Sequence, residues 1–263
     1  IVLFDMDGTL TPARKPAPLE IAEAIRRLTR FRKSKVGIVT GSGLDYLVEQ
    51  CSILWSGAGV CNPADLVLMP CNGTQVLKWN KAMGGFEDAH SVSMIKKLRK
   101  KKYGVLLSKL FKMQAEITDL NKIPLTGEFV SYRQSLLNWC PIGRAAGDEE
   151  REAFIKYDQE NNLRQKYLED LRQYCKEKKI KVTCALGGQT SIDIYPAGWD
   201  KSYALQHFED HVCWFIGDKC TGTGNDKQIY DALLDTGRAY QTTGPEETIS
   251  IINKIIPEIE ETS

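Results

Sequence analysis

Apolar positions along the chain follow two patterns, short uninterrupted runs and stretches with helical spacing. Four apolar residues open the sequence at 1–4, and similar runs occupy 36–39 and 213–217. Short runs bounded by Asp, Gly or Thr predict strands that are buried on both faces, as in a parallel sheet. Apolar residues three and four apart predict helices between and after them, for example at 21–28 and 252–259. This alternation predicts an α/β fold.

The middle of the chain has a different pattern. A basic helix comes first, then a strand at 128–133, a long helix through 157–174, and strands at 182–186 and 191–195. This order predicts a mixed α+β segment. We therefore expect a core domain in two parts with a cap inserted between them, divided at 1–83, 84–197 and 198–263.

Composition excludes several classes of function. The chain has 263 residues, a net charge of +1 and 26% charged residues, so it has no general attraction for nucleic acid or for a membrane surface. No apolar run approaches the length of a membrane span. Eight cysteines include no C-x-x-C pair, and no secretory signal is recognisable. We expect a cytoplasmic protein whose cysteines are reduced and mostly buried.

Two carboxylates directly follow the first predicted strand. Asp5 and Asp7 lie at its carboxyl end, which is where open α/β sheets bind ligands. An aspartate there can attack phosphorus to form an aspartyl-phosphate, and a carboxylate two residues further on can transfer protons. The sequence Asp-x-Asp-Gly is also common in ordinary turns, so these residues alone leave both interpretations open.

Three further segments supply other groups that phosphoryl transfer needs. Ser42 follows the second strand, where it can bind a phosphate oxygen at a helix N-terminus or cap the helix. Lys201 can attract Asp5 and a phosphate, although most lysines are solvated surface residues. Asp218 follows another strand, and its carboxylate, that of Asp5 and the main-chain carbonyl of Asp7 are oxygen ligands that suit Mg²⁺.

The segment DxDGTLT resembles motif one of the haloacid dehalogenase-like phosphotransferases. Longer segments across nearly the whole chain resemble the eukaryotic-type phosphomannomutases: DGTLTPAR at 7–14, GEFVSYRQSLLNWCPIGR at 127–144, EER at 149–151, NLRQKYLEDLR at 162–172, GGQTSIDIYPAGWDK at 187–201 and GDKCTGTGND at 217–226. The resemblance implies a haloacid dehalogenase-like Rossmannoid core with a parallel sheet, plus an inserted α+β cap domain.

The resemblance also implies a function. The enzyme would interconvert mannose 6-phosphate and mannose 1-phosphate through an aspartyl-phosphate and a hexose 1,6-bisphosphate. The implied catalytic residues are Asp5, Asp7, Ser42 and Lys201, and the implied Mg²⁺ ligands are Asp5, Asp7 and Asp218. The implied substrate-binding residues are Arg14, Arg133, Arg144, Arg151, Ser191 and Asp193.

Further expectations follow from the same resemblance. We expect some phosphoglucomutase activity and activation by glucose or mannose 1,6-bisphosphate. We also expect the enzyme to supply mannose 1-phosphate for GDP-mannose synthesis and to form a homodimer through the cap. The chain departs from the family pattern at Cys71 and at 230–238. In the family the second of these segments helps to hold a second metal ion, so that site stays open here, with Asp231 as a candidate ligand. A cap-bearing sugar-phosphate phosphatase is the alternative, in which water attacks the aspartyl-phosphate.

Overall fold

The computed structural model describes residues 1–30, 34–56, 61–118 and 123–262, and it divides into two compact units. Unit 1 comprises Ile1–Ser91 and Trp199–Ser263, and unit 2 comprises Val92–Gly198. The first boundary falls later than the predicted residue 84. The reason is that β5 (Gly85–Ser91) pairs with β4 (Gln75–Asn80) as an antiparallel hairpin at the edge of the unit 1 sheet.

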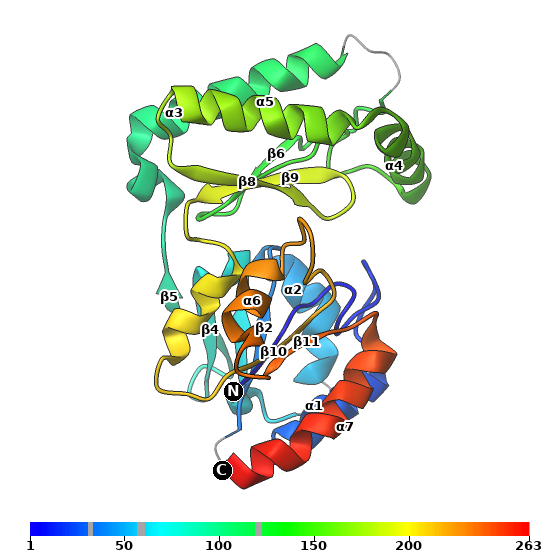
Figure 1. The fold of residues 1–263 in the computed structure, drawn as a ribbon, viewed down its shortest axis with the longest axis vertical. Helices are drawn as coiled ribbons and strands as arrows, with labels where there is room; N and C mark the ends of the chain where they lie inside the picture. Colours follow the sequence, from blue (N-terminus) through cyan, green and yellow to red (C-terminus); the bar gives the residue numbers. More distant parts are fainter. Residues whose placement is uncertain (31–33, 57–60, 119–122, 263) are drawn as a thin grey trace. The chain divides into compact units, whose positions relative to one another are not determined.

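A seven-stranded sheet forms the centre of unit 1, in the order β11-β10-β1-β2-β3-β4-β5 (Figure 1). The first five strands in this order are parallel, as predicted, and the last two are antiparallel. The parallel strands are β1 (Val2–Phe4), β2 (Val36–Val39), β3 (Leu66–Met69), β10 (Trp214–Gly217) and β11 (Ala239–Gln241).

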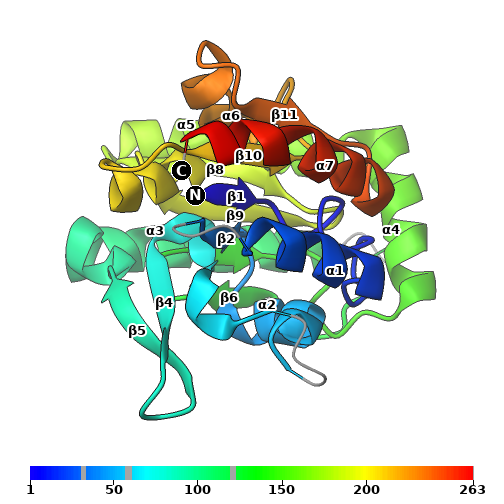
Figure 2. The same ribbon diagram turned by 90° about the horizontal axis from the view of Figure 1, so that it is seen from below.

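Helices cover both faces of this sheet. One hydrophobic cluster joins it to α1 (Leu19–Leu28), α2 (Leu44–Cys51) and α7 (Pro245–Thr262), and a second joins it to η4 (Lys201–Phe208) and α6 (Lys227–Leu234). Figures 1 and 2 both show α1 and α7 side by side. Three short 3-10 segments complete unit 1: η1 (Ser52–Leu54), η2 (Pro63–Asp65) and η3 (Cys71–Gly73).

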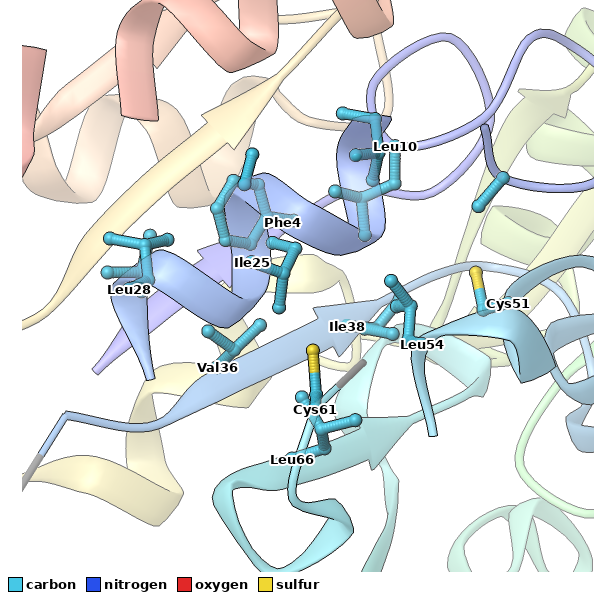
Figure 3. Close-up of a cluster of buried hydrophobic side chains, with 14 of the residues drawn as sticks. Phe4, Leu10, Ile25, Leu28, Val36, Ile38, Cys51, Leu54, Cys61 and Leu66 are labelled. Carbon is cyan, nitrogen blue, oxygen red and sulfur yellow. The ribbon is translucent and has the colours of Figure 1, made fainter. Parts of the chain in front are cut away.

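Burial on both faces explains why every residue of β1 is apolar. Phe4 points into the cluster beneath α1, where it lies near Ile25 and Leu10 (Figure 3). Its neighbour Leu3 belongs to the cluster on the other face, and both side chains are fully buried. Successive residues of a strand point to opposite faces, so a strand covered on both sides carries no polar position until it ends. Asp5 is the first polar residue after it.

Unit 2 contains an antiparallel four-stranded sheet in the order β6-β7-β9-β8. The strands are β6 (Val130–Tyr132), β7 (Leu137–Trp139), β8 (Val182–Gly187) and β9 (Ser191–Pro196), and the helices are α3 (Met94–Thr118), α4 (Asp148–Asn161) and α5 (Leu163–Glu177). Both α3 and α5 pack on the sheet.

The long helix predicted through 157–174 is wrong in one respect, because it is two helices. Asn162 separates α4 from α5 in a left-handed conformation with φ 51°. Asn tolerates this conformation better than most residues and therefore ends helices well. No helix within the described ranges combines the length and apolarity needed to cross a lipid bilayer.

Candidate active site

A buried lysine lies between two carboxylates beyond the end of β1. The Lys201 ammonium donates hydrogen bonds to Asp5 and to Asp226, and neither Lys201 nor Asp226 has any exposed surface. Burial alone lowers the pKa of Lys201, but the charges of Asp226 and Asp5 outweigh it and raise that pKa above its usual range. Since a buried charge is costly unless it is paired, the two carboxylates keep Lys201 charged.

Each member of this group comes from the end of a different element. Asp5 follows β1, and its backbone N–H donates to the Ile216 carbonyl of β10 at 2.9 Å. Lys201 begins η4, and Asp226 immediately precedes α6. The predicted pair of Lys201 with Asp5 is confirmed by their contact.

Asp226 is a candidate functional residue that sequence reasoning missed. It ends the segment GDKCTGTGND, but an acidic residue in a glycine-rich turn is common, and no role was assigned to it. The structure shows it accepting hydrogen bonds from Lys201 and from the Lys219 backbone N–H. A Cβ atom at Gly217 would lie 2.6 Å from Asp226 Oδ2, so this close approach requires glycine.

Three carboxylates gather at the same place. Asp5, Asp218 and Asp226 each offer an oxygen atom within 4.8 Å of the others. Asp218 Oδ1 is buried and has no hydrogen-bond partner among the described residues. Carboxylate oxygens are the ligands that Mg²⁺ prefers, and an unpartnered buried oxygen is costly unless a cation or water meets it. The group therefore fits a divalent cation, with Asp226 added to the predicted ligands.

Two predictions about metal ligands stay open. A main-chain carbonyl ligand at Asp7 remains a prediction. Asp231, the candidate for a second metal ion, accepts a hydrogen bond from Lys227 on α6, and their side chains are 47% and 41% exposed. A pair four residues apart on a helix surface accounts for Asp231 without a metal.

The electrostatics of the carboxylate group favour cation binding. Burial, followed by the charge of Asp226, raises the pKa of Asp5 to about 8, although Lys201 opposes this shift. Burial also raises the pKa of Asp218. A cation beside these oxygens would favour their ionised form, so metal and protons are expected to compete for the same site.

Asp7 has a separate set of hydrogen-bond donors. The Tyr46 hydroxyl on α2 donates to Asp7 Oδ1 at 3.0 Å, and the Arg14 backbone N–H donates to the same oxygen at 3.2 Å. Burial, followed by the charge of Asp7, raises the pKa of Tyr46, which therefore keeps its proton and remains a donor. Sequence reasoning missed Tyr46, because an aromatic residue at helical spacing is typical of a hydrophobic core.

Ser42 lies in the turn between β2 and α2. Its backbone N–H donates to Thr40 Oγ1 at 3.1 Å, and its carbonyl accepts from the Cys71 N–H at 2.9 Å. The N-cap of α2 is Gly43, which makes no side-chain cap, so the interpretation of Ser42 as the helix cap is wrong. Its binding of a phosphate oxygen stays a prediction.

In unit 2, a buried asparagine connects three predicted substrate-binding residues. Asn138 accepts a hydrogen bond from Arg144 Nη1 at 3.0 Å. It donates to Ser191 Oγ at 2.9 Å and to Asp193 Oδ1 at 2.6 Å. The register of β7 and β9 explains this contact, since Asn138 pairs directly with Asp193. Sequence reasoning did not assign a role to Asn138, although it lies within a recognised segment.

Arginine side chains also gather in unit 2. Burial, followed by the nearby charge of Arg133, lowers the pKa of Arg144, and Arg151 contributes in the same direction. Guanidinium groups this close repel one another in the absence of an anion, and their planar donors match phosphate oxygens. Arg14 belongs to unit 1.

Solved structures share the fold of this chain. The IMP-bound, N-terminally truncated IMP-nucleotidase of Plasmodium falciparum is 16% identical with a TM-score of 0.61, covering 97% of this chain and 67% of that chain. A trehalose-6-phosphate phosphatase related protein is 15% identical with a TM-score of 0.54, covering 100% of both chains. At these identities the likeness shows a shared α/β fold.

Sequence comparison shows the family to which the chain belongs. The family model described as eukaryotic phosphomannomutase matches residues 21–258, and the chain belongs to that family. A phosphomannomutase of Saccharomyces cerevisiae is 35% identical over 258 residues, covering 97% of this chain and 93% of the relative. A phosphomannomutase of Arabidopsis thaliana is 36% identical over 253 residues, which cover 95% of this chain and 94% of the relative. The chain is an enzyme of this type.

Proposed function

We propose that the enzyme interconverts mannose 6-phosphate and mannose 1-phosphate, with Asp5 carrying the phosphoryl group between substrates. The supporting observation is the contact of Asp5 with the buried Lys201, inside a group of carboxylates that fits a cation. The Asp5 carboxylate attacks one phosphorus of a hexose 1,6-bisphosphate, which leaves as a hexose monophosphate. A hydroxyl of the incoming monophosphate then attacks the aspartyl-phosphate and regenerates a bisphosphate.

The neighbouring residues of unit 1 each have a separate role in this transfer. Lys201 holds the Asp5 carboxylate in place and stabilises negative charge on the phosphoryl oxygens, while Asp226 holds Lys201. Asp5, Asp7 and Asp218, together with Asp226, would hold Mg²⁺, which would supply positive charge to offset the repulsion between the phosphoryl oxygens and the attacking carboxylate. The Ser42 hydroxyl, next to the N-terminus of α2, binds a phosphoryl oxygen.

Asp7 acts as the general acid and base. It gives a proton to the departing sugar oxygen and removes one from the attacking sugar hydroxyl. The Tyr46 hydroxyl and the Arg14 backbone N–H fix one oxygen of its carboxylate, which limits the directions in which the other can act.

We assign the second phosphate of the substrate to the arginines of unit 2. Arg133, Arg144 and Arg151 bind the phosphate that is not being transferred. Arg14, a residue of unit 1, is also proposed to bind substrate. Ser191 and Asp193 bind the phosphate and the sugar hydroxyls, and Asn138 orients their side chains. A bisphosphate must turn around between the two transfers, so it has to leave the arginines and bind them again in each cycle.

The remaining parts of the proposal rest on family membership. One inverted hydroxyl is a modest energetic difference, so glucose 1-phosphate is also a substrate, and glucose or mannose 1,6-bisphosphate is the activator. We further propose a cytoplasmic homodimer formed through unit 2, whose product is used to make GDP-mannose.

A coupled assay tests the proposal. Isomerisation of mannose 1-phosphate and glucose 1-phosphate is followed with and without glucose 1,6-bisphosphate, and release of inorganic phosphate is measured in parallel. We expect isomerisation that requires Mg²⁺ and bisphosphate and that greatly exceeds phosphate release. Asp5→Asn should be inactive, whereas the matched Asp210→Asn change, at an exposed aspartate with no proposed role, should leave the enzyme active. Phosphate release as fast as isomerisation would favour the phosphatase instead.

A further inference from the structure

A left-handed turn at Cys71–Gly73 follows the carboxyl end of β3 in unit 1. Its three residues, Cys71, Asn72 and Gly73, have positive φ angles of 51°, 64° and 78°. Glycine adopts this region freely and asparagine tolerates it, whereas the Cβ atom of a cysteine makes it unfavourable. Such strain persists only where the surrounding structure holds the backbone in place, and it is common at functional sites.

On one side, the left-handed turn holds the loop that carries Ser42. The Cys71 backbone N–H donates to the Ser42 carbonyl at 2.9 Å, and the Asn72 backbone N–H donates to the Thr40 carbonyl at 2.8 Å. β2 and β3 are parallel neighbours, so this loop and the left-handed turn leave the sheet at the same edge. The position of Ser42 is therefore tied to that of the left-handed turn.

On its other side, the left-handed turn contacts η4, which begins with Lys201. A 3-10 helix has three residues per turn, so Lys201, Ala204 and His207 lie along one edge of η4. A Cβ atom on Gly73 would lie 2.8 Å from the Ala204 Cβ, so this close packing requires glycine. His207 Nε2 lies 2.9 Å from the Gly73 carbonyl oxygen, which can only accept, so Nε2 donates this hydrogen bond.

The Asn72 side chain fixes the backbone just before Lys201. Its Nδ2 donates to the Trp199 carbonyl at 3.2 Å, and Asn72 is only 5% exposed. A buried amide needs hydrogen-bond partners, so the contact with Trp199 cannot be exchanged for one with bulk water. The contacts of Asn72 and His207 thus hold η4 on both sides of Lys201.

We propose that Asn72 and His207 are positioning residues for Lys201. Through the left-handed turn they fix the spacing between the Lys201 ammonium and the Ser42 hydroxyl. Both of these groups meet phosphoryl oxygens in the proposed function, on which this inference rests. Loss of either side-chain donor lets η4 shift, which slows phosphoryl transfer to Asp5 and leaves the binding of hexose phosphate by the arginines unchanged.

Asn72→Gly tests the inference, because glycine keeps the left-handed conformation and removes only the side chain. The rate of Asp5 phosphorylation by acetyl phosphate, and kcat and KM of isomerisation, are measured at a temperature where circular dichroism shows folded protein. We expect the phosphorylation rate and kcat to fall by about tenfold or more with KM nearly unchanged, since small misplacements of reacting groups can cost about a hundredfold. His207→Phe keeps the ring contacts with His90 and Tyr203 and should show the same pattern.

The matched control is Asn162→Gly in unit 2. Asn162 also has a positive φ, of 51°, but it is exposed and its side chain makes no capping hydrogen bond. This variant should keep wild-type rates. Wild-type phosphorylation rates in folded Asn72→Gly or His207→Phe would overturn the inference, as would a loss confined to stability or to KM.

The two measurements also separate this inference from the proposed function. A wild-type enzyme that is phosphorylated on Asp5 but does not isomerise hexose phosphates would contradict the proposed function alone. The phosphorylation rates of the variants would still test Asn72 and His207. A wild-type enzyme that is never phosphorylated on Asp5 would contradict both.

Discussion

Replacing Lys201 with Met should destabilise the protein severely. The change removes the only charge that directly contacts both Asp5 and Asp226 in this part of the described structure, and it leaves two carboxylates that are 4% and 0% exposed. Removing one partner of a buried ion pair costs about 3–5 kcal/mol. A protein of this size loses roughly 2–4 °C in its unfolding midpoint per kcal/mol, so we expect a fall of roughly 6–20 °C.

Thermal and urea unfolding, followed by circular dichroism in a chelating buffer at pH 7, measure this loss. The matched control is Lys227→Met, because Lys227 pairs with Asp231 in an exposed position where such pairs contribute about 0.3–0.5 kcal/mol. A second variant, Lys201→Met with Asp226→Asn, should recover a large part of the loss, since it removes one uncompensated charge.

Two results would refute this reasoning. One is a loss for Lys201→Met no larger than that for Lys227→Met. The other is a double variant less stable than the single one. Either would mean that Asp5 and Asp226 do not depend on Lys201 to neutralise their buried charge.

Three further predictions concern residues around the two polar groups. Tyr46→Phe removes a hydrogen-bond donor to Asp7. Because a hydrogen bond to a charged group is worth about 1.5–3 kcal/mol, kcat should fall at least about tenfold with little change in KM. Unchanged steady-state kinetics would contradict this prediction. Arg144→Met should weaken hexose phosphate binding by about 2–3 kcal/mol, seen as a higher KM, because a charge-assisted hydrogen bond is lost. Acetyl phosphate should still phosphorylate the enzyme, and equal losses with both donors would count against the prediction. Burial lowers the pKa of His207, so the unfolded chain binds its proton first and the protein loses stability as the pH falls below about 6.5. His207→Gln should flatten the unfolding free energy between pH 7 and 5, and an unchanged slope would contradict the assignment.

The strand ends of the parallel sheet could be predicted from sequence for a physical reason. A strand buried on both faces must be apolar, so its first polar residue marks its end, and Asp5 and Asp218 both follow such runs. Parallel strands carry their carboxyl ends to one edge, which brings those residues together without knowledge of side-chain contacts. The same reasoning did not predict Asp226, because this residue follows a glycine-rich turn and does not directly follow a strand.

The residues that sequence reasoning missed depend on contacts between distant segments. Tyr46 meets Asp7 from a helix 39 residues further along the chain, and Asn138 meets Asp193 through strand register. Neither contact leaves a periodic pattern in the sequence by which it could be predicted. The strand β5 was missed because most of its residues are polar or exposed, as is typical of an edge strand with one solvated face.

Transfer of a labelled phosphoryl group to Asp5 tests the central proposal most directly. The enzyme is mixed with Mg²⁺ and a hexose 1,6-bisphosphate carrying ³²P, quenched in acid, and digested for peptide mapping. We expect one labelled peptide, bearing the phosphoryl group on Asp5, and a chase with unlabelled mannose 1-phosphate should move that label into mannose 1,6-bisphosphate. Label on any other residue, no label at all, or the same labelling in Asp5→Asn would contradict the assignment of Asp5 as the nucleophile.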